Sequence, residues 1–186
     1  MQSKYLLTVV GEDRPGIVAR LTEVLVKHES NLEESRMAIL GGEFAAIVLI
    51  SADAAKLDAL NKDLSALQKE GITVTTKGTK PAISDRFAGH SWYHITLEGA
   101  DHEGIVYKVA QLLRDRSINI QSLETEVVHA PETGTPLFKM QATLAVPSAI
   151  RKPDLQKEMD RISEEELVTI QIKEADGAKL SAALQV

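Results

Sequence analysis

The chain has 186 residues, 44% of them hydrophobic and 26% charged, a composition typical of a globular protein with a real core. Lys and Arg total 21 against 27 Asp and Glu, and the formal net charge of −6 argues against a nucleic-acid binder, which carries a basic patch. Cysteine is absent, which excludes disulfides, thiolate metal sites and cysteine nucleophiles and fits the cytoplasm. No export signal or membrane span is expected, because the longest apolar run, Phe44 to Ile50, is far shorter than the roughly 20 residues a spanning helix needs.

The chain contains an internal repeat. Residues 7–31 align with residues 95–119 at an offset of 88, and eight of these 25 pairs are identical, where chance gives roughly one or two. Further along, Phe44 matches Phe138 at an offset of 94, so the second copy carries about six extra residues, which we place in a loop near 129–134. The chain is therefore predicted to be a tandem duplication.

Each copy predicts the same elements in the same order. A short strand, about 5–10 or 93–98, ends at a glycine and precedes a helix with one apolar stripe. Two strands then form a hairpin, which turns at Gly41-Gly42 in the first copy, before a second helix and a closing strand. The stripe consists of Ile17, Val18, Leu21, Val24 and Leu25 in the first copy and of Ile105, Val106, Val109, Leu112 and Leu113 in the second.

The order βαββαβ, found twice, predicts an α+β fold of two ferredoxin-like units in tandem, each an antiparallel sheet with both helices on one face. We place the first unit at 1–79, a linker at 80–91, the second unit at 92–176 and a tail at 177–186. The strand 44–50 is apolar on both sides, so the sheet face without helices needs cover. We expect such faces to pack against each other, either between the two halves or between two chains as a homodimer.

The first strand-to-helix turn, 11–17 in one copy and 99–105 in the other, is the most informative segment. A helix start leaves backbone N–H groups without partners and carries partial positive charge, so glycines there let a carboxylate approach the amides. Asp13 and Asp101 either cap the helix, which is the simpler reading, or attract the ammonium group of a zwitterionic ligand. Asn31 and Asn119 serve either as positive-φ stop signals or as amide groups turned toward the turn of a neighbouring domain.

The turn Asp13-Arg14-Pro15-Gly16-Ile17-Val18, the later Asn31-Leu32 and the βαββαβ repeat resemble ACT domains, which are small amino-acid-sensing modules, over about residues 4–174. The resemblance implies that a small amino acid, with glycine and serine as candidates, binds at interfaces between such domains. The ligand-binding residues that it implies are Gly11, Asp13, Arg14, Gly16, Ile17 and Asn31 in the first copy and Gly99, Asp101, His102, Gly104, Ile105 and Asn119 in the second. Because His102-Glu103 replaces Arg14-Pro15, we expect the two sites to differ in affinity.

The resemblance also implies a regulator with no catalytic residues and no cofactor, which acts through a protein partner such as a transcription activator and contacts neither nucleic acid nor membrane directly. The alternatives are a detached regulatory subunit of an amino-acid metabolic enzyme and an ACT protein that has lost its ligand.

The other constellations in the sequence predict no chemical site. His90 and His94 have the spacing of a helical metal pair, but they stand at a strand start, roughly 13 Å apart by strand rise, so no metal site is expected. A nucleophile elbow, a Walker loop and a three-glycine dinucleotide fingerprint are all missing from the sequence. Aromatic residues make up only 4%, which disfavours an RNA-recognition module of the same element order.

Overall fold

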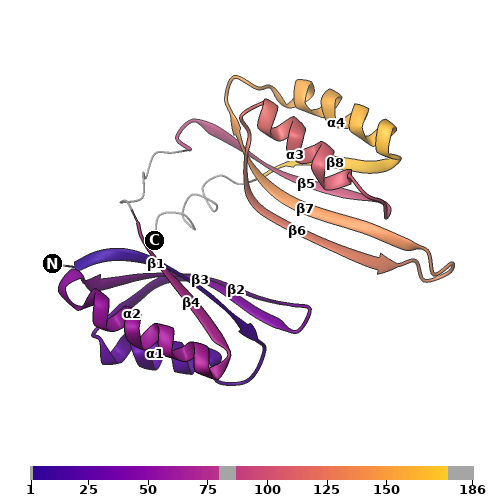
Figure 1. Ribbon diagram of the computed structural model, residues 1–186. Coiled ribbons are helices and arrows are strands. Elements are labelled where there is room, and N and C mark those ends of the chain that lie inside the picture. The colour runs from indigo at the N-terminus through magenta and orange to yellow at the C-terminus, as the bar shows by residue number, and fades with distance from the viewer. Residues whose placement is uncertain (1, 80–86, 176–186) are drawn as a thin grey trace. The chain divides into compact units, whose positions relative to one another are not determined.

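The computed structural model describes residues 2–79 and 87–175, which form two compact units (Figure 1). Unit 1 contains β1 (Gln2–Glu12), α1 (Ile17–Lys27), β2 (Asn31–Leu40), β3 (Glu43–Asp53), α2 (Leu57–Ala66) and β4 (Ile72–Gly78), with single 3₁₀ turns at Ala54–Lys56 and Leu67–Glu70. Unit 2 contains β5 (His90–Ala100), α3 (Ile105–Asp115), β6 (Asn119–His129), β7 (Pro136–Pro147), α4 (Lys152–Glu166) and β8 (Val168–Glu174). This order confirms the predicted α+β fold of two βαββαβ units.

The predicted boundaries between the units are described only in part. Residues 80–86 of the predicted linker and the whole predicted tail, 177–186, lie outside the described residues. Strand β5 begins at His90, inside the segment predicted as linker.

Both sheets are antiparallel and share one topology, with strand orders β2-β3-β1-β4 and β6-β7-β5-β8. The predicted repeat reappears in the strand register, because Gly11 pairs with Phe44 and Gly99 pairs with Phe138. The first hairpin turns at Gly41 and Gly42, whose φ angles of 60° and 83° explain why glycine is used there. The extra residues of the second copy lie in the loop between β6 and β7.

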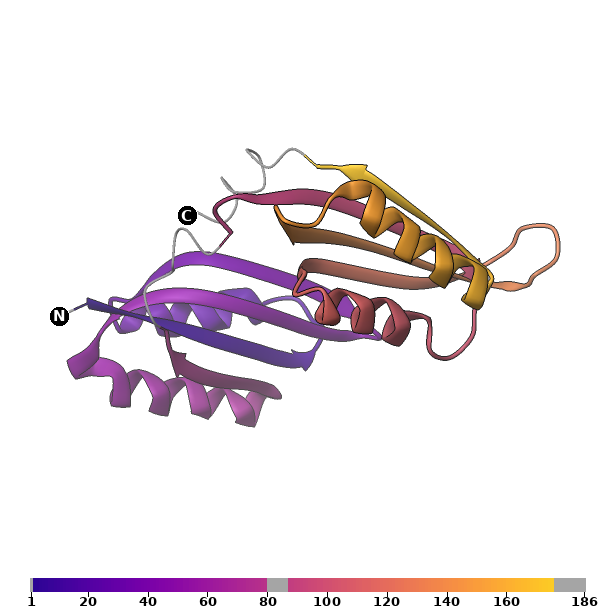
Figure 2. The same ribbon diagram turned by 90° about the horizontal axis from the view of Figure 1, so that it is seen from above.

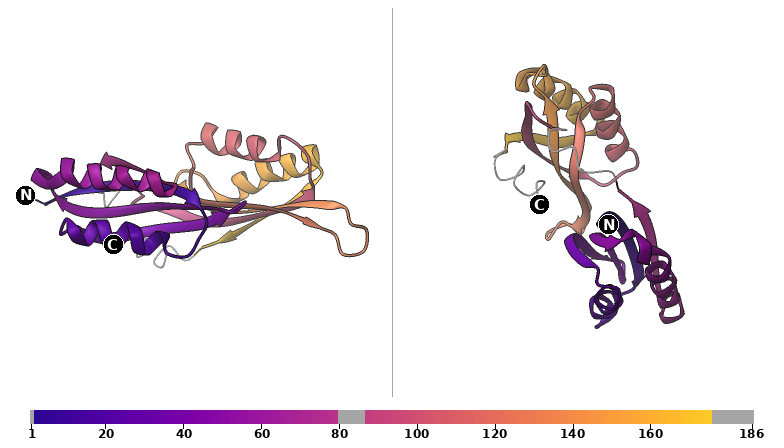
Figure 3. Two further views of the ribbon diagram at one scale, coloured as in Figure 1. Left: turned by 60° about the horizontal axis from the view of Figure 1, so that its bottom comes forward. Right: turned by 90° about the vertical axis from the view of Figure 1, so that its left-hand side faces the viewer.

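The core of each unit lies between its sheet and its two helices, which cover the same sheet face (Figures 2 and 3). The predicted helical stripe is buried in both units with one clear exception. Val18 is 41% exposed, because one residue beyond the buried Ile17 the helix has turned by about 100°, away from the sheet. Val106 and Leu112 are only partly buried against the core of unit 2.

We call the sheet face without helices the open face. In unit 1 it carries an apolar patch of Leu6, Val10, Ala45, Ile47 and Leu49, which agrees with the sequence pattern. In unit 2 the positions that correspond to the patch carry His94, Glu98, Lys139, Gln141 and Thr143. The need for cover, which was inferred from one strand of the first copy, therefore does not extend to the second.

Candidate functional site

The helix that follows the first turn is preceded by a glycine with positive φ in both units. Helix α1 starts at Ile17 after Gly16, with φ 98°, and α3 starts at Ile105 after Gly104, with φ 100°. A Cβ at either glycine would meet nothing within 4 Å, so backbone conformation and not lack of space requires glycine there. The amides of the first helical turn have no acceptor within the helix, and they carry the positive end of the helix dipole.

Asp13 and Asp101 do not occupy the N-cap position. That position belongs to Gly16 and Gly104, three residues further on, so the capping reading of the two aspartates is wrong. Their backbone N–H groups donate to the carbonyls of Gly42 at 2.9 Å and Pro136 at 3.2 Å, which ties each turn to the neighbouring hairpin. Both aspartates are exposed, and their carboxylates stand in the turn that leads to the helix start.

Gly11 and Gly99 are needed for a different reason from Gly16 and Gly104. A Cβ at Gly11 would lie 2.6 Å from the carbonyl oxygen of Gly71, and a Cβ at Gly99 would lie 2.5 Å from Val168 Cγ1. Both glycines therefore allow the closing strand to lie close against the first strand. Ligand access, which the sequence suggested for the glycines of this turn, is not needed to explain this pair.

Arg14 and His102 both tie the first turn to the end of the second helical segment. Arg14 Nη2 donates to the carbonyl of Glu70 at 2.5 Å, and His102 Nε2 lies 2.9 Å from the carbonyl of Glu166. Carbonyls at a helix end carry partial negative charge, so a cationic side chain is favoured in both places. The two copies thus keep one interaction with two residue types, a permanent cation in unit 1 and a titratable one in unit 2.

The surroundings of His102 favour its charged form. Its Nδ1 lies 3.1 Å from the carbonyl of Glu103, so both ring nitrogens face acceptors, and only the imidazolium can donate from both. The pKa of His102 is raised above its ordinary value, chiefly by the Glu166 carbonyl, then by that of Glu103, with smaller contributions from the Glu166 and Asp101 carboxylates. Lys108 Nζ lies 3.4 Å from Glu166 Oε1 and partly balances that carboxylate.

Asn31 and Asn119 are not the residues that end the first helix. The positive φ angles occur two residues earlier, at Glu29 with 53° and at Ser117 with 54°, so the stop-signal reading is wrong. In unit 2 the N–H of Ile118 donates to the carbonyl of Leu113 at 2.8 Å, the 6→1 bond of a Schellman motif, and unit 1 repeats it.

Both asparagines begin the second strand and make short local contacts. Asn31 Nδ2 lies 3.5 Å from Glu33 Oε1, and Asn119 Nδ2 donates to the carbonyl of Ile120 at 3.2 Å. The strand register then shifts between Leu32 and Glu34, and at the matching place in unit 2.

This β-bulge two residues after each asparagine was missed by the sequence reasoning. It places Glu33 in unit 1 and Gln121 in unit 2 out of the regular pairing, which re-aims their side chains. The pKa of Glu33 is lowered by hydrogen bonds from Ser51, the largest cause, and then from Lys4 and Asn31. The bulged residues themselves, Glu33 and Gln121, are not turn residues, so only the recurrence of the bulge after the aligned asparagines could have drawn attention to it.

The predicted site residues fall into two clusters at opposite ends of each unit. Gly11 pairs with Phe44, whereas Asn31 pairs with Ser51, so their partners lie seven positions apart on β3, a distance of roughly 24 Å by strand rise. Unit 2 repeats this arrangement, with Gly99 opposite Phe138 and Asn119 opposite Ala145. One small amino acid cannot touch both clusters of the same unit.

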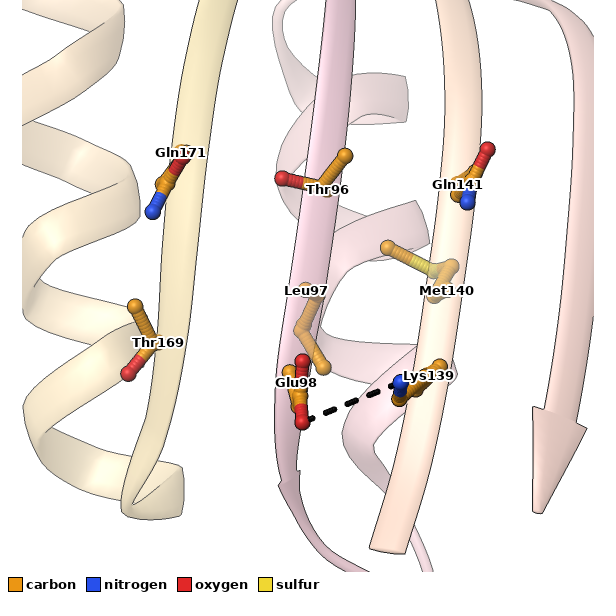
Figure 4. Close-up of a pocket in the computed structure, with 8 residues that line it drawn as sticks. All are labelled: Thr96, Leu97, Glu98, Lys139, Met140, Gln141, Thr169 and Gln171. Carbon is orange, nitrogen blue, oxygen red and sulfur yellow. Dashed lines mark ion pairs between the residues drawn. The ribbon is translucent and has the colours of Figure 1, made fainter. Parts of the chain in front are cut away.

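A separate depression of about 470 Å³ lies on the open face of unit 2 (Figure 4). Its lining is mostly polar and includes Thr96, Gln141 and Gln171, and Glu98 faces Lys139 across it at 4.0 Å. None of the predicted ligand-binding residues lines this depression.

His94 and the other candidate metal ligands show no cluster. His94 Nδ1 lies 3.0 Å from Thr143 Oγ1. Among residues 2–79 and 87–175, no three His, Asp or Glu side chains are placed to share a metal ion. Within those same ranges, none of the helices combines the length and the apolar character that crossing a membrane requires.

Comparison with known proteins adds the following similarities. Residues 4–77, the greater part of unit 1, match the family profile of the ACT domain. The UPF0237 protein of Methanopyrus kandleri is 36% identical over 69 residues, which is 37% of this chain and 76% of that protein. The glycine cleavage system transcriptional repressor of Escherichia coli is 23% identical over 157 residues, 84% of this chain and 82% of the repressor. The crystal structure of an unknown protein from Galdieria sulphuraria is similar over 95% of this chain and 100% of that one, with 34% identity and a TM-score of 0.79.

Proposed function

Because the chain belongs to the ACT domain family, we propose that it binds a small amino acid where ACT units meet and acts through a protein partner. It is a regulatory protein related to the glycine cleavage system transcriptional repressor, and not an enzyme. The expected ligand is glycine or serine, because the resemblance to that repressor suggests a small amino acid.

The main support for this proposal is that helices α1 and α3 each begin directly after a glycine with positive φ. In both units a glycine with φ near 100° opens the helix, and no side chain fills the space where a Cβ would stand. The amides of Ile17 and Ile105 and of the residues after them suit a carboxylate. Asp13 and Asp101 do not cap their helices, so their carboxylates remain suited to an ammonium group.

The separation of the two clusters supports a site built from more than one unit. Asn31 and Asn119 lie at the far end of their own sheets from the turns, by roughly 24 Å. We therefore assign each asparagine to the turn of another unit, either in the same chain or in a second copy. Arg14 and His102 act in this scheme as positioning residues, because their side chains hold the turn against the second helical segment.

The partner, the assembly and the compartment belong to the same proposal. We propose a homodimer in the cytoplasm and a protein partner such as a transcription activator, with no direct contact to nucleic acid; the absence of cysteine and the net charge of −6 agree with this. The second candidate is a detached regulatory subunit of an amino-acid metabolic enzyme. Co-purification of a catalytic chain would favour it.

Thermal unfolding of the full chain against a panel of amino acids tests the proposal. A ligand at 100 times its Kd adds about 2.7 kcal/mol to native stability, so glycine or serine should raise the midpoint in a dose-dependent way. Gly16→Val and Asn31→Ala should remove the shift, whereas Gln171→Ala, an exposed polar change on the open face of unit 2, should keep it. The D-enantiomer of serine controls for unspecific effects of serine. No shift for glycine or for any L-amino acid at millimolar concentration would contradict the proposal.

A further inference from the structure

The open face of unit 1 differs from that of unit 2 although the two sheets share topology and register. Two members of the apolar patch are strongly exposed, Val10 by 48% and Ile47 by 51%. Nearby on the same face, Leu40 is 76% exposed. Exposed apolar residues gathered in this way mark an interaction surface.

Unit 2 does not offer a matching surface. Where the patch has Leu6, Ile47 and Leu49, unit 2 has His94, Gln141 and Thr143. His94 Nδ1 and Thr143 Oγ1 already lie 3.0 Å apart. Packing the apolar patch on that face would still remove the Gln141 amide from water without giving it a partner, which is unfavourable. A second apolar face of the same kind, such as the patch of another copy, avoids this cost.

The polar groups at the edges of the patch fit a second copy as well. Strand pairing puts Glu34, Leu49, Leu6 and Lys77 in one row, from one edge of the sheet to the other. If two copies meet face to face about a two-fold axis parallel to the strands, β2 of one lies over β4 of the other. Glu34 then faces Lys77 of the second copy, and Leu49 faces Leu6, so charge and apolarity are complementary in this row. Glu34 also pairs with Arg36 of its own strand, at 2.8 Å.

The central row contains three polar side chains, Arg36, Thr8 and Thr75, and each has a partner. Arg36 Nη2 lies 2.8 Å from Glu34 Oε1. Thr8, which stands between Ile47 and Thr75 on the open face, contacts Thr75 through its hydroxyl group. Its burial between two sheets would therefore leave its hydroxyl satisfied.

We propose that the open face of unit 1 is a self-association surface, on which the apolar patch of one chain packs against the same patch of a second copy. This proposal deepens the homodimer of the proposed function by naming its surface. Sheets that pack face to face lie about 10 Å apart and interdigitate their side chains. Four strands and four rows cover roughly 500 Å² per copy, so the interface is near the lower limit for specific association and dimerisation should depend on concentration.

Sedimentation analysis of the full chain over a micromolar concentration range tests the surface. The variant Val10→Glu with Ile47→Gln introduces the residues that unit 2 carries at these positions, where the same sheet folds with them. We expect its dimer dissociation constant to rise by roughly tenfold or more. The matched control, Thr96→Ala with Gln141→Ala on the open face of unit 2, should dimerise like the unmodified chain.

A charge exchange tests the two-fold arrangement. Lys77→Glu alone should weaken the dimer. Glu34→Lys combined with Lys77→Glu should recover part of the affinity, since Glu34→Lys also removes the ion pair with Arg36. A chain that stays monomeric at all concentrations, or a dimer that Val10→Glu with Ile47→Gln leaves intact, would overturn the proposal. Circular dichroism of each variant establishes that unit 1 is folded, and the amino-acid thermal shift is recorded on the same samples. Sedimentation tests the self-association surface, whereas the thermal shift tests amino-acid binding. Each proposal can therefore be refuted without the other.

Discussion

Substitution of Gly11 by alanine is predicted to destabilise unit 1 through a backbone clash. The new Cβ would lie 2.6 Å from the carbonyl oxygen of Gly71, whereas ordinary contact begins at 3.4 Å. The start of β4 must therefore retreat by roughly 0.8 Å, and overpacking of this kind costs about 1–3 kcal/mol. For a unit of this size, each kcal/mol lowers the unfolding midpoint by about 4–8 °C.

Gly78→Ala is the matched control for this prediction. Gly78 also lies in β4, but a Cβ there meets nothing within 4 Å, and its φ lies outside the left-handed region. Its substitution should therefore change the free energy of unfolding by no more than about 0.5 kcal/mol.

The chain offers an assay that separates the two units. Its single tryptophan, Trp92, is buried in unit 2, so fluorescence follows that unit, whereas circular dichroism follows both. In urea titrations Gly11→Ala should move the circular dichroism transition and leave the Trp92 transition nearly in place. Unchanged stability together with loss of the amino-acid thermal shift would refute the steric reasoning and assign Gly11 to ligand access.

Three further predictions follow from the turn and from the end of α3. Because the pKa of His102 is raised in the folded state, its stabilisation of unit 2 is complete below the unfolded value of about 6.5 and is lost as pH rises through the folded value. His102→Arg should remove this component of the pH dependence seen by Trp92 fluorescence in urea, and equal slopes in both proteins would contradict it. Gly16→Ala should cost about 1–2 kcal/mol because of its positive φ, and a neutral result would show that the turn relaxes. Ser117→Gly should stabilise unit 2 by about 0.5–1 kcal/mol, since glycine adopts a φ of 54° without strain; a lower Trp92 midpoint would argue against this.

Local patterns determined the element order and much of the pairing. The offset that aligns Gly11 with Gly99 and the later one that aligns Phe44 with Phe138 predicted equivalent strands, and both glycine–phenylalanine pairs occur in the sheets. The periodic apolar residues identified the buried helix faces, because the helix repeat and the sheet alternation are properties of neighbouring residues. Val18 is exposed although it belongs to the predicted stripe, because the stripe defined by residue spacing is wider than the part of the helix that the sheet covers.

The roles of the candidate site residues depend on contacts between the first turn and the end of the second helical segment, which are far apart in the sequence. Arg14 and His102 reach carbonyls 56 and 64 residues further along the chain, and no spacing within the turn signals those contacts. The need for glycine at position 11 also comes from a residue far along the chain, because a Cβ there would clash with the carbonyl oxygen of Gly71.

The sequence by itself determined that this chain is a duplicated βαββαβ protein with one conspicuous turn in each copy. Only the tertiary structure decided that Asn31 lies at the opposite end of the sheet from that turn, since α1 runs back along β1 before β2 begins. It also decided that the apolar open face belongs to unit 1 alone, because a face is composed of residues that four separate strands bring side by side. Which residues share a sheet face or a sheet end depends on the pairing of strands far apart in the sequence, and local propensity and periodicity do not report that pairing.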